Sequence, residues 1–157
     1  MRRVLALILL VSVMCTPQEV SAKPSAQQRK SIAIISIPRI KLISQVYVGV
    51  TNDIFDIGVG KWPGTPDPGE KGNLVLGGHR TSGSHPFKKI NYLRSGDIVT
   101  LISQGKTHLY RVTGNQIVKP TALWITNPTL GATLTLFACH PLGQTTSRYV
   151  VRAVLTS

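Results

Sequence analysis

The chain has 157 residues, of which 42% are hydrophobic, and its 18 lysines and arginines against 6 acidic residues give a net charge of +12. This length suits one domain with one buried core, and the hydrophobic content excludes a long disordered segment. The positive surplus favours anionic surroundings, such as nucleic acid, lipid headgroups or an anionic cell-wall polymer.

Residues 1–22 have the pattern of an export signal. Met1-Arg2-Arg3 is a short basic region, and the nearly unbroken apolar run of residues 4–15 falls short of the ~20 residues that a membrane-spanning helix needs. Val20-Ser21-Ala22 offers a cleavage site made of small residues. We therefore predict that residues 1–22 form a secretory signal peptide or a short membrane anchor.

Residues 23–31 predict a basic linker. Lys23, Arg29 and Lys30 flank a stretch of proline, serine, alanine and glutamine, which is typical of a solvated segment beside a membrane. We expect the folded domain to span residues 32–157. It would lie at the extracellular face of the cytoplasmic membrane if the signal stays as an anchor, or in the cell wall if the signal is cleaved. An exported protein seldom meets nucleic acid, so we expect the basic surface to face an anionic membrane or wall polymer.

The first part of the domain predicts strands followed by turns. Residues 32–43 alternate β-branched and aliphatic side chains with a break at Pro38, a pattern that predicts strand, turn and strand. Residues 45–50 continue as strand. Residues 51–72 are rich in glycine, proline and aspartate, so they predict turns and no helix.

The sequence pattern in the middle of the domain predicts three strands and one helix. Residues 73–78 are a short apolar run that ends in a glycine pair, directly before a histidine. Residues 87–93 predict a short helix, the only helical segment expected before residue 120. Residues 98–102 and 108–118 predict two strands, joined by a turn at Gln104-Gly105.

The end of the domain is strongly β. Residues 122–125 predict a helical turn, whereas residues 133–138 and 149–155 are rich in threonine, leucine and valine without a helical period. The loop HPLGQTTS lies between these two strands. About eight short strands with long connections predict a mainly β fold, a closed or nearly closed barrel with short helices in the connections.

Cysteine usage points to chemistry. The chain has two cysteines, and Cys15 lies inside the targeting segment. The folded domain therefore keeps one thiol, Cys139, and can form no internal disulfide. Buried structural cysteines are the commoner kind, but a lone thiol on an exported domain is a liability unless it is buried or used.

Two further residues combine with Cys139 into a set that suffices for acyl transfer. His79 follows a strand in GGHR, Cys139 ends one in TLFACHP, and Arg148 begins the last strand. Taken singly, a histidine at a strand end or an arginine at a strand start is usually a surface residue. Together, a thiolate can attack a carbonyl, an imidazole can protonate the leaving amine, and a guanidinium can hold the oxyanion.

Other chemistries have weaker support. A zinc site would draw on His79, His85, Cys139 and His140, but adjacent residues on a strand face opposite ways, so we predict no metal and no cofactor. The acidic residues of the domain fall in turns and form no acid–base pair. A hydroxyl nucleophile would need a G-x-S-x-G elbow, which the sequence lacks.

The sequence resembles the sortase family over residues 34–155. The resemblance runs through three blocks, which are IISIPRIKL with QVYVGV, then GVGKWPGTPDPGEKGNLVLGGHRTSGSHPFKKINYLRSGDIV, and TLTLFACHPLGQTTSRYVVRAVL. Histidine, cysteine and arginine occur in the family's order, each in its expected neighbourhood. The resemblance implies a single closed eight-stranded β-barrel and a cysteine transpeptidase, a thiol peptidase that anchors surface proteins in Gram-positive bacteria.

The same resemblance implies roles for the three residues. Cys139 would attack the Thr–Gly bond of an LPxTG- or LAxTG-like C-terminal sorting signal on another exported protein. His79 would protonate the leaving glycine amine and later deprotonate the incoming nucleophile, and Arg148 would stabilise the oxyanion. An amine of a cell-wall precursor or a pilin lysine would then accept the acyl group. Calcium, which some class A members bind, has little support because acidic residues are few.

One position departs from the family pattern, because Ala138 stands where a threonine usually precedes the cysteine. The short spacing from cysteine to arginine, the loop after the histidine and the Cys-His-Pro sequence resemble class E most, with classes D and F as alternatives. Two other functions stay open. An L,D-transpeptidase would want an S-x-G-C context, which Phe137-Ala138-Cys139 does not supply. An inactive sortase-like module for wall binding or pilus assembly would not need all three residues.

Overall fold

The computed structural model describes residues 29–157, so the predicted signal segment and most of the predicted linker lie outside the described residues. Within residues 29–157, no helix is long and apolar enough to span a lipid bilayer. The strands are β1 (Ala33–Ile37), β2 (Leu42–Val48), β3 (Val59–Lys61), β4 (Gly72–Gly77), β5 (Ile98–Ser103), β6 (Lys106–Val118), β7 (Ala132–His140) and β8 (Ser147–Leu155). Helical turns occur in the connections, as α1 (Asn52–Phe55) and the 3-10 turns η2 (Pro38–Ile40), η3 (Ile90–Tyr92) and η4 (Leu123–Thr126).

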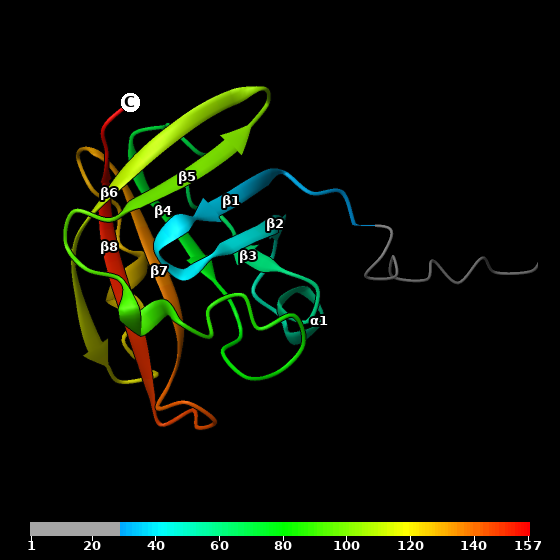
Figure 1. Ribbon diagram of the computed structural model, residues 1–157. Helices are drawn as coiled ribbons and strands as arrows, with labels where there is room; N and C mark the ends of the chain where they lie inside the picture. The colour runs from blue at the N-terminus through cyan, green and yellow to red at the C-terminus, as the bar shows by residue number, and fades with distance from the viewer. Residues whose placement is uncertain (1–28) are drawn as a thin grey trace, which may run out of the picture.

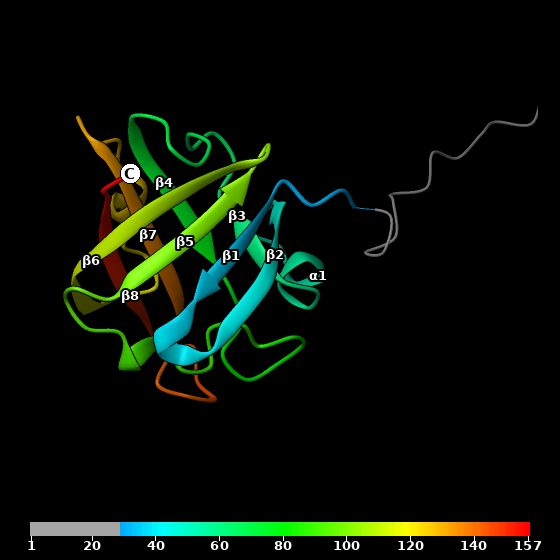
Figure 2. The ribbon, with the colours of Figure 1, turned by 45° about the horizontal axis from the view of Figure 1, so that its top comes forward.

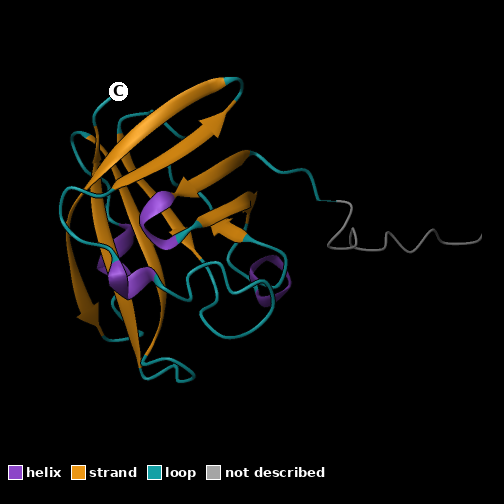
Figure 3. Ribbon diagram, in the orientation of Figure 1, coloured by secondary structure: helices purple, strands orange, loops and turns teal. Residues whose placement is uncertain are grey.

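The strands close into one barrel in the order β1-β2-β3-β4-β7-β8-β6-β5 (Figures 1 and 2). β2 pairs with β3 and β4 pairs with β7 in parallel, whereas the other neighbouring pairs are antiparallel. Helical turns occupy only connections between the strands (Figure 3). The predicted mainly β fold, a closed eight-stranded barrel with short helices in its connections, is confirmed.

The side chains of β4, β7 and β8 form two apolar layers, one inside the barrel and one on its outer face, because successive side chains on a strand point to opposite faces. The inner layer belongs to the main core, and these strands contribute to it Leu74, Leu76, Leu134, Leu136, Val151 and Ala153. The outer layer consists of Val75, Phe137 and Val150, packed against Ile125 of the connection between β6 and β7. That connection, which carries η4, therefore covers the outer face of these three strands.

Residues 51–72, predicted to form turns without a helix, contain both α1 and β3, so this prediction was wrong. Ile54 and Val59 are fully buried. Tertiary packing thus holds a helical turn and a strand that are too short to give a periodic sequence pattern. Gly60 in β3 also packs closely, since a Cβ at this position would lie 2.2 Å from the carbonyl oxygen of Gly49.

The helix predicted over residues 87–93 is reduced to the 3-10 turn η3. Phe87, Ile90 and Leu93 are all fully buried. Their spacing of three residues suits a 3-10 turn, which has three residues per turn and places such positions on one side. The turns η2 and α1 precede this segment, so the prediction that it is the only helical segment before residue 120 was also wrong.

Asn73, on the outer face of β4, ties the connection between β6 and β7 to the barrel. Its side chain is buried, and its Nδ2 donates hydrogen bonds to the carbonyl oxygens of Ile125 at 2.9 Å and Asn127 at 3.0 Å. Its Oδ1 accepts a hydrogen bond from Thr135 Oγ1 at 2.6 Å. The amide therefore fixes the segment around η4 against β4 and β7.

We expect Asn73→Ala to lower the free energy of unfolding by about 2–3 kcal/mol, because it removes the donor to the buried Ile125 carbonyl oxygen and the acceptor of the Thr135 hydroxyl proton. Urea denaturation followed by tryptophan fluorescence measures the change. Asn127→Ala is the matched control, since it deletes the same group from an exposed side chain and should change stability by less than about 0.5 kcal/mol. Equal effects of the two variants would contradict the anchoring role of Asn73.

Candidate active site

Strand register brings the three predicted site residues to one end of the barrel. Cys139 of β7 is the direct Cα partner of Arg148 of β8. Gly77, the last residue of β4, pairs in parallel with Phe137 of β7. His79 lies as far beyond Gly77 as Cys139 lies beyond Phe137, so the two are level across the ladder. In Figure 1 this is the lower end of the barrel, where β7 turns into β8.

His79, Cys139 and Arg148 all line one cavity of about 470 Å³. Strand alternation explains why Cys139 and Arg148 share it, because both lie in the outward-facing rows of their strands. Two aromatic side chains form part of the apolar wall. The rings of Phe55 and Phe137 meet edge to face with their centroids 6.4 Å apart. The cavity thus combines three polar side chains with an apolar surface.

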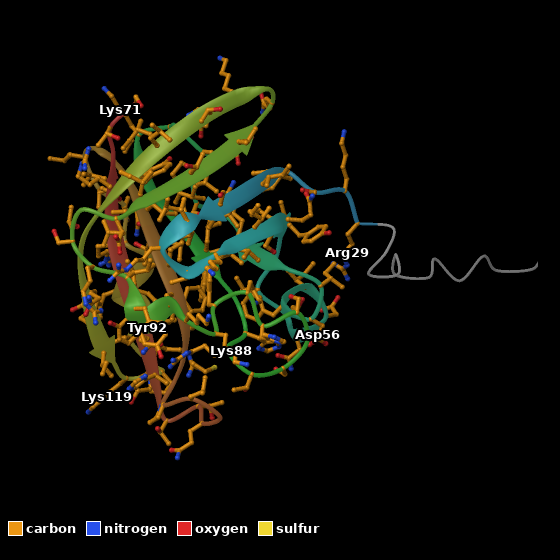
Figure 4. The ribbon with its side chains drawn as sticks, in the orientation of Figure 1. Arg29, Asp56, Lys71, Lys88, Tyr92 and Lys119 are labelled. Atoms are coloured by element: carbon orange, nitrogen blue, oxygen red, sulfur yellow. The ribbon has the colours of Figure 1, made fainter. Side chains whose placement is uncertain are left out.

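His79 is positioned by α1, the helical turn that the sequence analysis missed. Its Nε2 lies 3.5 Å from Asp56 Oδ1, and the edge of its ring meets Phe55 with centroids 5.4 Å apart. Asp56 directly follows α1, beside the long connection from β4 to η3 (Figure 4). That connection packs closely against it, since a Cβ at Gly83 would lie 2.4 Å from Asp56 Cα. A carboxylate thus accompanies the imidazole.

Cys139 is a half-buried free thiol. Its neighbour Ala138 is 2% exposed and belongs to the main core, on the opposite face of β7. A threonine at position 138 would therefore carry its side chain into the apolar interior of the barrel. This placement separates position 138 from the outward-facing row that carries Cys139.

Arg148 bonds to the loop that leads into its own strand. Its Nη1 donates hydrogen bonds to the carbonyl oxygens of Thr145 and Ser147, both at 3.0 Å. A guanidinium carries five N–H donors, so further donors remain for a ligand in the cavity. The two backbone bonds hold the side chain near Cys139 while leaving its charge in place.

A second arginine, Arg80, lies under Cys139 and was missed by the sequence analysis. It is 5% exposed. Its Nη1 donates to the carbonyl oxygen of Cys139 at 3.4 Å and lies 3.1 Å from His140 Nδ1, and its Nη2 donates to Asn91 Oδ1 at 2.8 Å. Burial lowers the pKa of Arg80 below its ordinary value. The only sequence signal was its place directly after His79, where an arginine usually faces solvent.

The histidines considered for a metal site are not brought together. His85 is exposed and its ring bonds to the carbonyl oxygen of Gly83, whereas His140 contacts Arg80. Neither is among the residues that line the cavity. Across residues 29–157, no three histidine, cysteine or acidic side chains gather closely enough to hold a metal ion.

Comparisons with known proteins agree with this geometry. The family model that matches residues 35–156 is described as a sortase domain. Sortase D of Bacillus subtilis (strain 168) is 29% identical in an alignment that covers 86% of this chain and 75% of that protein. A lid mutant of sortase A from Corynebacterium diphtheriae has a TM-score of 0.78 at 28% identity, over 83% of this chain and 72% of that one. Sortase E from Streptomyces avermitilis has a TM-score of 0.75 at 31% identity, over 82% of this chain and 89% of that one.

Proposed function

Since this chain belongs to the sortase family, we propose that it is a cysteine transpeptidase that attaches exported proteins to an amine. It cleaves an LPxTG- or LAxTG-like sorting signal between threonine and glycine, and transfers the acyl group to a cell-wall precursor or a pilin. The observation that carries this proposal is the meeting of Cys139, His79 and Arg148 at a single cavity.

In the first half of the proposed reaction, the Cys139 thiolate attacks the threonine carbonyl carbon. The carbonyl oxygen becomes an oxyanion, and the guanidinium of Arg148 stabilises it by charge and hydrogen bonds. The C–N bond then breaks as His79 transfers a proton to the leaving glycine amine. The products are a thioester on Cys139 and a free C-terminal peptide.

In the second half, His79 accepts a proton from the incoming amine, which attacks the thioester carbonyl. A second oxyanion forms beside Arg148 and collapses to a new amide, and the Cys139 thiolate is released. No cofactor is consumed, because the energy of the first amide bond is kept in the thioester. The same three side chains serve both halves.

The apolar wall of the cavity supports a substrate with aliphatic residues. Phe55, Trp62 and Phe137 line it together with Leu123 of η4. Leu123 is 63% exposed, so η4 presents an apolar side chain that a leucine or proline of a sorting signal can cover. This chemistry fits the first residues of an LPxTG or LAxTG signal.

The domain limits and location follow from the same proposal. Residues 1–22 act as a signal peptide or anchor, residues 23–31 as a basic linker, and residues 32–157 as the catalytic domain. The enzyme works at the extracellular face of the cytoplasmic membrane or in the wall. Sortases of classes A, D and E match this chain at 28%, 29% and 31% identity, so the class E expectation stays a prediction.

The proposal is tested by incubating the full chain with quenched LPxTG and LAxTG peptides, with and without an amine acceptor such as triglycine. We expect cleavage between threonine and glycine and, with the amine, a ligated product seen by mass spectrometry. Peptides that carry alanine in place of the threonine are the matched control. If the protein cleaves neither the LPxTG nor the LAxTG peptide, the proposed activity is overturned and the inactive wall-binding module remains.

We expect Asp56→Asn to lower kcat/KM for peptide cleavage by about two- to fivefold, because it removes the carboxylate beside His79. The effect is small because this carboxylate is half exposed and such pairs contribute little. Asp53→Asn is the matched control, since Asp53 lies within the adjoining α1 but pairs with Arg29. A loss above 100-fold on Asp56→Asn, or an equal loss on Asp53→Asn, would contradict a supporting role.

A further inference from the structure

Arg80 is a buried charge without a carboxylate partner. Its side chain is almost fully covered, and none of the ion pairs within residues 29–157 includes it. It lies at the end of the barrel that carries Cys139, as do Lys88 and Tyr92 of the neighbouring connection (Figure 4). A buried guanidinium is costly unless charge or hydrogen bonds compensate it.

The hydrogen bonds of Arg80 compensate only part of that cost. Its Nη atoms meet groups that carry no negative charge, which are the carbonyl oxygens of Cys139 and Lys88, the Asn91 amide oxygen and the His140 ring. Its Nε is buried and has no partner among the described residues. An anion close to Arg80 would complete the compensation.

The titratable groups around Arg80 leave one candidate for that anion. His79 precedes it, Cys139 and His140 face it from β7, Tyr149 from β8 and Tyr92 from η3. Histidines carry no negative charge, and tyrosines ionise near pH 10. Arg148 and Lys88, on neighbouring elements, are cations. Among these groups only Cys139 carries a thiol, and thiols as a class ionise at a lower pH than phenols. Burial lowers the pKa of Arg80, and the nearby Tyr149 and Cys139 oppose that shift.

We propose that Arg80 is the buried counter-ion of the Cys139 thiolate, a positioning residue that stabilises the nucleophile. It acts through charge on the sulfur and through the hydrogen bond to the Cys139 carbonyl oxygen. Arg148 is thereby left to serve the substrate oxyanion. This inference rests on the proposed function, because it assigns a role within the same site.

The hydrogen bond between Arg80 and His140 depends on the protonation of the His140 ring. Arg80 Nη1 can donate to His140 Nδ1 only while that nitrogen carries no proton. Protonation of His140 would place a second positive charge beside Arg80 and break this bond. With Nδ1 unprotonated, the His140 ring, which also contacts Tyr149 with ring centroids 5.7 Å apart, helps to hold Arg80 under Cys139.

The test measures the pH dependence of Cys139 alkylation by iodoacetamide in the full chain, read by mass spectrometry on the peptide that carries Cys139. We expect Arg80→Met to raise the pH midpoint of alkylation by about one unit and to lower the rate at pH 7 about tenfold. Arg80→Lys, which keeps the charge, should hold the midpoint within about half a unit of the wild type.

A second variant keeps the test decisive if Arg80→Met does not fold. Asn91→Asp preserves the side-chain shape but places a carboxylate 2.8 Å from Arg80 Nη2. The carboxylate should offset the guanidinium charge and so also raise the pH midpoint of Cys139 alkylation. Arg94→Met is the matched control, because Arg94 is exposed and bonds to nearby backbone carbonyls. It should alkylate as the wild type does.

A wild-type midpoint in Arg80→Met, or in Asn91→Asp if Arg80→Met does not fold, would overturn the inference. A midpoint in Arg94→Met raised as far as in the tested variant would overturn it too. Alkylation needs no sorting signal, so the result is independent of peptide cleavage. A raised midpoint in a protein that cleaves no peptide would leave Arg80 as the partner of the thiolate while refuting the transpeptidase. A wild-type alkylation midpoint in the Arg80 variant of a protein that cleaves peptides would support the transpeptidase and refute the role of Arg80.

Discussion

Replacing Cys139 with alanine is expected to abolish cleavage of LPxTG and LAxTG peptides, with residual activity at the level of the uncatalysed reaction. Covalent catalysis needs an atom that forms the thioester, and a methyl group cannot do so. The structure places no other thiol within residues 29–157, so no neighbour can take over. Peptide fluorescence at high enzyme concentration sets the detection limit.

The other cysteine provides the matched control for this experiment. Cys15→Ala makes the same chemical change in the predicted signal segment and should leave kcat/KM within about twofold of the wild type. Circular dichroism and thermal unfolding would show that both variants keep the barrel. Measurable turnover by Cys139→Ala, above the rate of a heat-inactivated sample, would contradict the assignment of the nucleophile.

Replacing Arg148 with lysine is expected to lower kcat by about 100- to 1000-fold, although the charge is kept. Removal of one oxyanion donor typically costs this much in turnover. A lysine cannot reproduce the planar fork, and its single nitrogen would have to reach the carbonyl oxygens of Thr145 and Ser147 and the oxyanion from one point. We expect KM for the peptide to change by less than about threefold, because the donor acts in the transition state.

Arg152→Lys is the matched control for Arg148→Lys. Arg152 lies on the same face of β8, but it bonds to Thr135, stacks over Trp124 at 5.9 Å and lines a different cavity. We expect it to lose less than about threefold in kcat. Near-normal turnover by Arg148→Lys, or equal losses in the two variants, would show that Arg148 is not the oxyanion donor.

The barrel could be predicted because its long strands carry strong local patterns. Alternation and β-branched residues mark β7 and β8, and both strands form as predicted apart from their ends. The segment 51–72 could not be predicted, because α1 and β3 are short and depend on packing around the buried Ile54. Local sequence carries little information about such elements.

The three residues proposed for catalysis were visible in the sequence, because each stands at a strand end in a distinctive context. Their supporting residues were not visible. Asp56 meets His79 only through tertiary folding of α1, and Arg80 reads as a solvated residue after a strand until its burial is known. Ala138, which departs from the family pattern, faces the core and not the row that carries Cys139.

The central claim is that Cys139 carries the acyl group, and intact-protein mass spectrometry during turnover tests it most directly. The full chain is mixed with an LPxTG or LAxTG peptide without amine acceptor and quenched with acid. We predict a mass increase equal to that of the peptide up to its threonine, less one water, located on Cys139 by fragmentation and removed by hydroxylamine. Peptide cleavage with an adduct on another residue, or with no adduct under any quench time, would contradict the account.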